Sequence, residues 1–173
     1  MTFTYPEVGA TRAGERPDGY RHLTVRHRLS RHAHPVEDLV WLGEQLLTWR
    51  VHAAARVRLE TGATAAAPGV PVTTLLGVGP VVLREVCEVV WVERSPDRVA
   101  FAYGTLPGHA FVGEEMFAVE RDAAGDLWWR IEVFSRPVLW WLRPVSWALP
   151  TFQRLFAHHL GRGAERLLRR RTA

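Results

Sequence analysis

Apolar and polar residues alternate along several stretches of the chain, which is the pattern of half-buried β-strands. In RHLTVRHRLS, residues 21–30, the leucines and the valine share one face with His27, while threonine and arginine occupy the other. Further strand-like runs cover residues 72–76, 81–93, 99–104, 110–121 and 127–135. The connections at 94–97 and 122–125 are short and rich in turn residues, so the strands they join are expected to be antiparallel neighbours.

Two other segments repeat apolar residues every three or four positions, as amphipathic helices do. The first starts at Pro35, a residue suited to the first helical position, and its series runs from Val36 to Arg50. The second runs from Thr151 to Arg170. This order predicts an α+β fold in which a curved antiparallel sheet wraps around a long C-terminal helix. Without an internal repeat or linker, residues 1–173 are expected to form a single domain.

Composition narrows the class of protein. One cysteine, Cys87, rules out an intrachain disulfide, and the first 20 residues lack a signal-peptide pattern, so we expect a cytoplasmic protein. Arg143, Pro144 and Pro150 interrupt the most apolar region, and we expect no transmembrane segment. The formal net charge of +4 comes from arginine alone. The basic C-terminal run suits a helix dipole, and without interleaved aromatics it predicts no nucleic-acid binding.

The stretch FAYGTLPGHAFVGEEMF, residues 101–117, places titratable residues inside the predicted sheet. Strand alternation puts Glu115 on the same face as Phe117, and Glu114 on the opposite face. The same alternation places Tyr103 on the apolar face of the preceding strand, and Trp129 and Ile131 on that of the next. A carboxyl group in such surroundings is expected to have a raised pKa.

Two structural alternatives stand beside a functional interpretation. Glu115 could form a salt bridge with an inward arginine, for which Arg50 and Arg136 are the candidates. His109 could cap its own loop, or it could lie at the mouth of a cavity at one end of the sheet. Six strand residues, or about 20 Å, separate His109 from Glu115, so we expect no direct contact between them.

Other residues carry weaker signals. His32 and His34 are not accompanied by further ligands at metal-site spacing, so we interpret them as part of a solvated loop and expect no metal or cofactor. Trp140, Trp141 and Trp147 either close the core or form an apolar surface patch.

The segments YPEVGAT (5–11), LLTWRVHAAARVRL (46–59), FAYGTLPGHAFVGEEMF and FSRP (134–137) resemble a domain-of-unknown-function family of bacteria and plants, over nearly the whole chain. That family is similar in layout to the START-like, polyketide-cyclase-like helix-grip superfamily, whose members bind lipids, steroids, polyketides and other hydrophobic molecules. The resemblance implies a helix-grip fold with a cavity between sheet and C-terminal helix. After His109 this chain has Ala-Phe-Val instead of the expected Pro-Glu, which removes an acidic residue from that edge.

The leading hypothesis is a monomeric or homodimeric protein that binds a small hydrophobic molecule in this cavity. The expected ligand-binding residues are Tyr103, Glu115, Phe117, Trp129, Ile131, Arg136 and Phe156. A second hypothesis is a cyclase-like or dehydratase-like enzyme in which Glu115 acts as general acid or base, Tyr103 orients it and His109 is a further catalytic candidate. A third is a non-catalytic scaffold or membrane-surface protein that uses the three tryptophans and the arginine-rich C-terminus.

Overall fold

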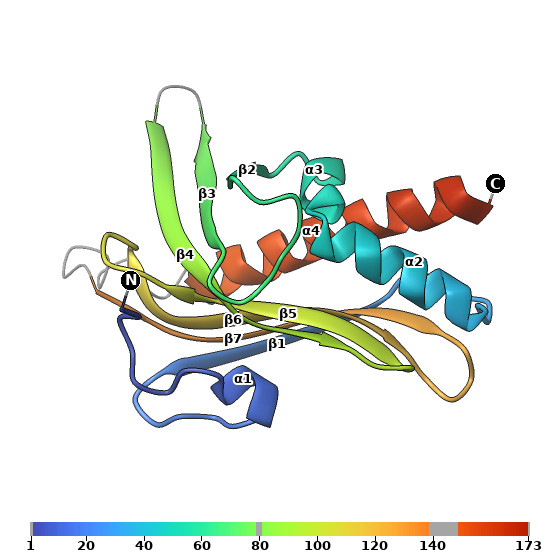
Figure 1. Cartoon of the computed structure of the whole chain (residues 1–173), viewed down its shortest axis with the longest axis horizontal. Coiled ribbons are helices and arrows are strands. Elements are labelled where there is room, and N and C mark those ends of the chain that lie inside the picture. The colour runs from blue at the N-terminus through green and yellow to red at the C-terminus, as the bar shows by residue number, and fades with distance from the viewer. Residues whose placement is uncertain (1, 79–80, 139–148, 173) are drawn as a thin grey trace.

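Figure 1 shows a curved antiparallel sheet with helices packed along it in a computed structural model that describes residues 2–78, 81–138 and 149–172. Its strands are β1 (Arg21–Arg28), β2 (Arg58–Glu60), β3 (Pro71–Val78), β4 (Val81–Arg94), β5 (Arg98–Thr105), β6 (Phe111–Arg121) and β7 (Leu127–Pro137). They are ordered β1-β7-β6-β5-β4-β3-β2, and every neighbouring pair is antiparallel. The first strand therefore pairs with the last one.

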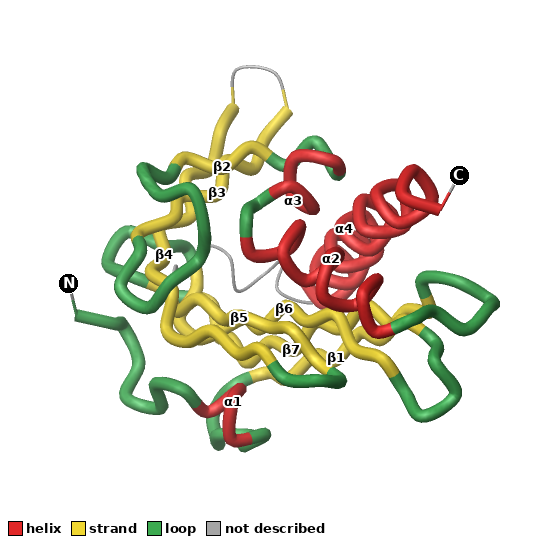
Figure 2. Tube along the Cα trace, turned by 45° about the vertical axis from the view of Figure 1, so that its right-hand side comes forward, coloured by secondary structure: helices red, strands yellow, loops and turns green. Residues whose placement is uncertain are grey.

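The helices are α1 (Ala10–Ala13), α2 (Val36–Leu47), α3 (Arg50–Ala54) and α4 (Leu149–Thr172). Helices α2, α3 and α4 lie on the face toward which β3 and β4 curve, whereas α1 lies on the opposite face (Figures 1 and 2). We call the first of these the inner face and the second the outer face. The arrangement confirms the predicted α+β layers with a long C-terminal helix.

The largest apolar core lies between the inner face and the three helices. Phe101, Phe117 and Trp129 are fully buried in it. Gly43 lets α2 approach the sheet closely, because a Cβ atom there would lie 2.5 Å from the side chain of Val99. Close contact between helix and sheet is the reason the alternating strand residues on this face are almost all apolar.

The first long helix ends earlier than the periodic pattern predicted. Helix α2 stops at Leu47, and Trp49 adopts a left-handed backbone conformation with φ 65° before α3 begins. The indole of Trp49 donates a hydrogen bond to the carbonyl oxygen of Ala63 at 3.1 Å. This break turns α3 away from the axis of α2 and brings His52 over the sheet.

Helix α4 is fixed at both ends. Near its start, the carbonyl oxygen of Ala157 accepts a hydrogen bond from the Trp129 indole at 3.1 Å. Near its end, Arg171 Nε donates to Asp38 Oδ1 on α2 at 2.7 Å. No helix of the described residues has both the length and the apolar character that crossing a bilayer requires.

Candidate functional site

Glu115 and Tyr103 form a pair on the inner face. They are direct cross-strand neighbours on β6 and β5, and the Tyr103 hydroxyl donates to Glu115 Oε2 at 3.0 Å. Burial raises the pKa of Glu115 to about 7, and the hydrogen bond from Tyr103 lowers it by less. Burial and the neighbouring Glu115 raise the pKa of Tyr103, so its phenol remains a donor. The carboxyl group thus gains or loses a proton near neutral pH.

No described arginine forms an ion pair with Glu115. Arg136 is exposed and stacks on the ring of Tyr20, with its guanidinium carbon 5.2 Å from the ring centroid. Strand alternation places it on the outer face, because its neighbour Phe134 packs there against Tyr5. Arg50 is also exposed, within reach of Gln45. The structure therefore places Arg136 away from the cavity wall where we had expected it, and neither arginine forms the salt bridge considered from the sequence.

The other expected ligand-binding residues have different degrees of burial. Phe117, Trp129 and Ile131 are fully buried in the core, and Phe156 on α4 is half-buried against it. Glu115 itself keeps part of its surface exposed, although its neighbours Tyr103 and Val133 are 7% and 8% exposed. Glu115 is therefore less completely covered than these two cross-strand neighbours.

His109 pairs with a carboxylate that the sequence did not single out. Its Nδ1 atom lies 2.8 Å from Glu85 Oε2, and that same oxygen accepts the amide of Ala110 at 3.1 Å. Glu85 is 4% exposed on the inner face of β4, and its Oε1 atom is buried with no hydrogen-bond partner among the described residues. The amide of Phe111 also lies 2.9 Å from His109 Nδ1, so this nitrogen either donates to Glu85 or accepts from the loop.

Alternation along β4 would have identified Glu85. It lies two residues before Cys87 and four before Val89, both of which are buried inner-face residues. From the sequence, His109 is related to Glu115, to its own loop and to a cavity mouth, and no partner on β4 is considered. Glu85 lies on β4, the neighbour of β5, so identifying it as the partner of His109 requires the strand order and register of the sheet.

His52 on α3 is a buried imidazole without a partner. It is 1% exposed, and both ring nitrogens lack hydrogen-bond partners among the described residues. The rings of Trp49, Phe101 and Phe117 surround it at centroid distances of 6.2, 6.3 and 5.5 Å. Burial lowers the pKa of His52 to about 4, so the ring is neutral at pH 7.

We expect His52 to make the fold sensitive to acid. The pKa of His52 is lower in the folded chain than in the unfolded chain, so protons bind the unfolded chain preferentially as pH falls. The free energy of unfolding is therefore unaffected by the titration of His52 above about pH 6.5 and decreases as pH falls toward 4. The loss should approach about 3 kcal/mol at pH 4. Urea unfolding of wild type and His52→Phe at pH 7.5, 5.5 and 4 measures it. A constant difference between the two proteins at all three pH values would contradict the assignment.

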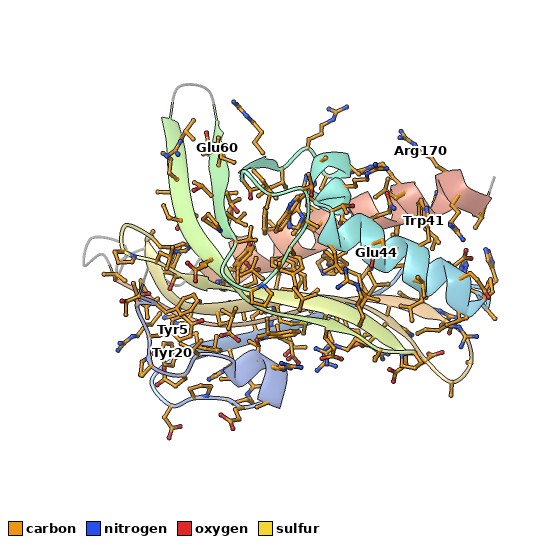
Figure 3. The ribbon with its side chains drawn as sticks, viewed as in Figure 1. Tyr5, Tyr20, Trp41, Glu44, Glu60 and Arg170 are labelled. Carbon is orange, nitrogen blue, oxygen red and sulfur yellow. The ribbon has the colours of Figure 1, made fainter. Side chains whose placement is uncertain are left out.

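Glu114, next to Glu115 in sequence, points to the outer face and holds the N-terminal segment. Its Oε2 atom accepts the Tyr5 hydroxyl at 2.8 Å and the amide of Gly9 at 2.7 Å. Its Oε1 atom accepts the amide of Thr11 at 3.1 Å and also the Thr11 hydroxyl. In Figure 3, Tyr5 lies on the side of the sheet opposite α2 and α4. The two adjacent glutamates thus serve opposite faces.

Side-chain hydrogen bonds hold the loop at 30–35, which the sequence interpretation treats as solvated. His34 is 5% exposed and bridges Ser30 Oγ at 2.6 Å and Asp38 Oδ2 at 2.9 Å, which corrects its interpretation as a solvated residue. Burial opposes ionisation of Asp38, but hydrogen bonds from His34 and Arg171 outweigh it and hold the pKa of that carboxyl below its usual value. In residues 2–78, 81–138 and 149–172, no three His, Cys, Asp or Glu side chains are grouped as metal ligands.

The residues invoked for a scaffold or membrane-surface role divide into two groups. Trp140, Trp141 and Trp147 lie outside the described residues. Within the arginine-rich C-terminus, Arg171 pairs with Asp38 and stacks on Trp41, while Arg166 donates to the carbonyl oxygen of Ala54. Part of this basic run therefore attaches α4 to the other helices.

Described residues form hollows elsewhere at the surface, among them the following two. One, of about 90 Å³, lies near Thr11 and Phe134, and the other, of about 530 Å³, is wide open beside β2 and β3 near Leu59 and Thr73. Neither includes Glu115 or Tyr103. Glu115 combines a titratable carboxyl with an inward position, and on this ground the candidate site is placed at the Glu115–Tyr103 pair.

Comparisons with known proteins agree with this arrangement. A family described as "Domain of unknown function (DUF1990)" matches residues 4–163. A UPF0548 protein of Deinococcus radiodurans is 43% identical over 74 residues, which cover 43% of this chain and 37% of that protein. The matched stretch thus spans little more than a third of that relative's length.

Solved structures share the fold at low sequence identity. TTHA0849 from Thermus thermophilus has a TM-score of 0.63 at 12% identity, over 88% of this chain and all of that one. Norcoclaurine synthase from Thalictrum flavum, solved in complex with dopamine and hydroxybenzaldehyde, has a TM-score of 0.57 at 11% identity, over 86% and 87% of the two chains. The helix-grip fold expected from the resemblance is therefore confirmed.

Proposed function

Because this chain belongs to the DUF1990 family and has the helix-grip fold, we propose that it binds a small, mostly apolar molecule between the inner face and α4. Glu115 and Tyr103 serve as the polar contacts of this molecule. The observation that carries the proposal is the hydrogen-bonded pair of Glu115, an incompletely buried residue, and Tyr103 on a face lined mainly by buried apolar residues. Pockets of this kind typically combine apolar walls with a few convergent polar groups.

A cavity-filling variant tests the binding site. Val133 is the direct neighbour of Glu115 on β7, so Val133→Trp should fill the space beside the carboxyl. Thr24→Trp, on the exposed outer face of β1, is the matched control. We expect Nile red, a neutral apolar dye, to fluoresce with wild type and Thr24→Trp, and at least about tenfold less with Val133→Trp at equal concentrations.

Thermal melting of the same variants supplies the second readout. Where space is present, Val133→Trp should melt within a few degrees of wild type, whereas overpacking a filled core costs about 1–3 kcal/mol. Absence of dye binding to wild type, together with a large melting loss in Val133→Trp, would overturn the proposal. Native mass spectrometry of protein isolated from its own host then identifies a copurified molecule.

One observation favours a catalytic version of this site. A carboxyl group with a pKa near 7, oriented by a phenol, is suited to act as general acid or base at neutral pH. In this version Glu115 transfers the proton, and Tyr103 orients the carboxyl. Norcoclaurine synthase, which shares the fold, is an enzyme by name, and this adds a precedent for chemistry on this scaffold but no residue roles.

The pKa of Glu115 is directly measurable. We expect its side-chain carboxyl carbon, followed by NMR in labelled protein, to titrate with a midpoint near pH 7, and the resonance to be absent in Glu115→Gln. Glu120→Gln removes an outer-face carboxyl that pairs with Arg130 and serves as the control for assignment. A midpoint near the ordinary glutamate value of about 4.3 would rule out the acid-base role.

Cytoplasmic location and a monomeric or homodimeric state remain predictions from the sequence. Fractionation of the host cell and light scattering of the purified protein test them. A protein that sediments with membranes would instead favour the membrane-surface hypothesis.

A further inference from the structure

The inner face carries two carboxyl side chains at the same end of the sheet. Glu85 lies on β4 and Glu115 on β6, and Cys87 lies close enough to both that each raises the pKa of its thiol, in addition to the larger effect of burial. Cys87 itself is 2% exposed. Two acids flanking one buried residue give this end of the inner face an acidic character.

Both carboxyl groups keep an oxygen free for a further donor. Glu115 Oε2 accepts from Tyr103, while its Oε1 atom receives no hydrogen bond from the described residues. Glu85 Oε2 is held by His109 and Ala110, and its Oε1 atom is fully buried and unpartnered in the same part of the chain. A buried, unpaired carboxylate oxygen is costly, so a donor that reaches it is favoured.

The described arginines do not neutralise this end. Arg136 stacks on Tyr20 on the outer face, and Arg84, the neighbour of Glu85 in sequence, faces away and pairs with Glu60. The chain as a whole has a formal net charge of +4, so the acidic character is local. A cationic ligand would be attracted by the local negative potential of this end, although the net positive charge of the rest of the protein repels it.

Aromatic rings complete the surroundings of Glu115. Phe101, Tyr103 and Phe117 have mutual centroid distances of 5.2, 5.0 and 6.0 Å on the inner face. Ring faces attract cations as well as apolar groups. His52, which packs on Phe117, is neutral at pH 7 and does not repel a positive charge.

These observations together identify a ligand class. We propose that the molecule bound at this site carries a protonated amine on an apolar body, and that its ammonium group donates to the free oxygen of Glu115. Glu85 adds negative potential from β4, which is separated from β6 by β5, and Tyr103 beside Glu115 contacts the apolar body. This inference rests on the proposed binding function and adds the charge and chemistry of the ligand.

Three probes with one ring system test the charge preference. They are 2-naphthylmethylamine, 2-naphthylmethanol and 2-naphthoate, used at pH 8 to displace Nile red from the wild-type protein. We expect the amine to displace the dye at about tenfold lower concentration than the alcohol, and the carboxylate to be the weakest. In Glu115→Gln the advantage of the amine over the alcohol should disappear, while the alcohol binds as before.

Matched variants distinguish the effect of the carboxyl groups at this site from the effect of the overall charge of the protein. Glu120→Gln removes one outer-face charge and should leave the amine preference unchanged, whereas Glu85→Gln should reduce it. Circular dichroism of each variant confirms that it is folded before displacement is compared. Nile red binding with equal or better displacement by the alcohol overturns the amine assignment and leaves the proposed pocket standing. Failure of Nile red to bind wild type removes the pocket and, with it, this inference.

Discussion

Replacing Glu114 by alanine should destabilise the protein by about 3–5 kcal/mol, because several buried hydrogen-bond donors lose their common acceptor and each unpaired donor costs about 1–3 kcal/mol. The side chain is 1% exposed and receives hydrogen bonds from Tyr5, Gly9 and Thr11. Its loss leaves all of these donors unpaired. Burial raises the pKa of Tyr5 strongly, so the phenol cannot compensate by ionising. Urea unfolding measures the change in the free energy of unfolding.

The neighbouring glutamate provides the control. Glu115→Gln should not destabilise the protein at pH 7, because the amide oxygen still accepts from Tyr103 and the substitution removes a charge whose burial opposes folding. Limited proteolysis should show early cleavage within residues 2–20 in Glu114→Ala and not in Glu115→Gln. Equal destabilisation by the two substitutions would mean that the outer-face contacts of Glu114 do not anchor the N-terminal segment.

Gly113→Ala should be the other strongly destabilising substitution, costing about 4 kcal/mol or more. Gly113 has φ 148°, a backbone conformation that residues with a Cβ atom rarely adopt. A Cβ atom there would lie 1.9 Å from the carbonyl oxygen of Phe134 on β7. Because that oxygen belongs to the backbone, β6 and β7 would have to separate beside the two glutamates.

Substitutions at two other glycines separate the cost of the backbone conformation from the cost of the steric clash. Gly108 has φ 100° but nothing within 4 Å of the added Cβ, so Gly108→Ala should cost only about 1–3 kcal/mol from backbone strain. Gly62 has neither constraint, and Gly62→Ala should be nearly neutral. Melting temperatures should fall in the order Gly62→Ala, Gly108→Ala, Gly113→Ala. A Gly113→Ala protein that melts with Gly108→Ala would contradict a clash with Phe134.

The motifs of the sequence have different physical origins in the structure. Gly104 leaves room for Tyr5, whose hydroxyl would lie 2.1 Å from a Cβ atom at that position. The tyrosine of YPEVGAT, this glycine and the first glutamate of the Gly-Glu-Glu sequence therefore form one outer-face contact. Tyr103 and Glu115, one residue away from each, form the inner-face pair. A single continuous motif thus serves both stability and the candidate site.

The sequence by itself determined every strand except β2, the long C-terminal helix and the opposite faces of Glu114 and Glu115, because alternation along a strand is a local property with a fixed period of two. It also placed Tyr103 beside Glu115 on one wall. Only the tertiary structure decided that Glu85 pairs with His109, that Glu114 holds the N-terminal segment and that Arg136 turns outward. Those contacts depend on strand register and on segments that meet from distant parts of the chain, as Tyr5 and Glu114 do, which no local pattern encodes.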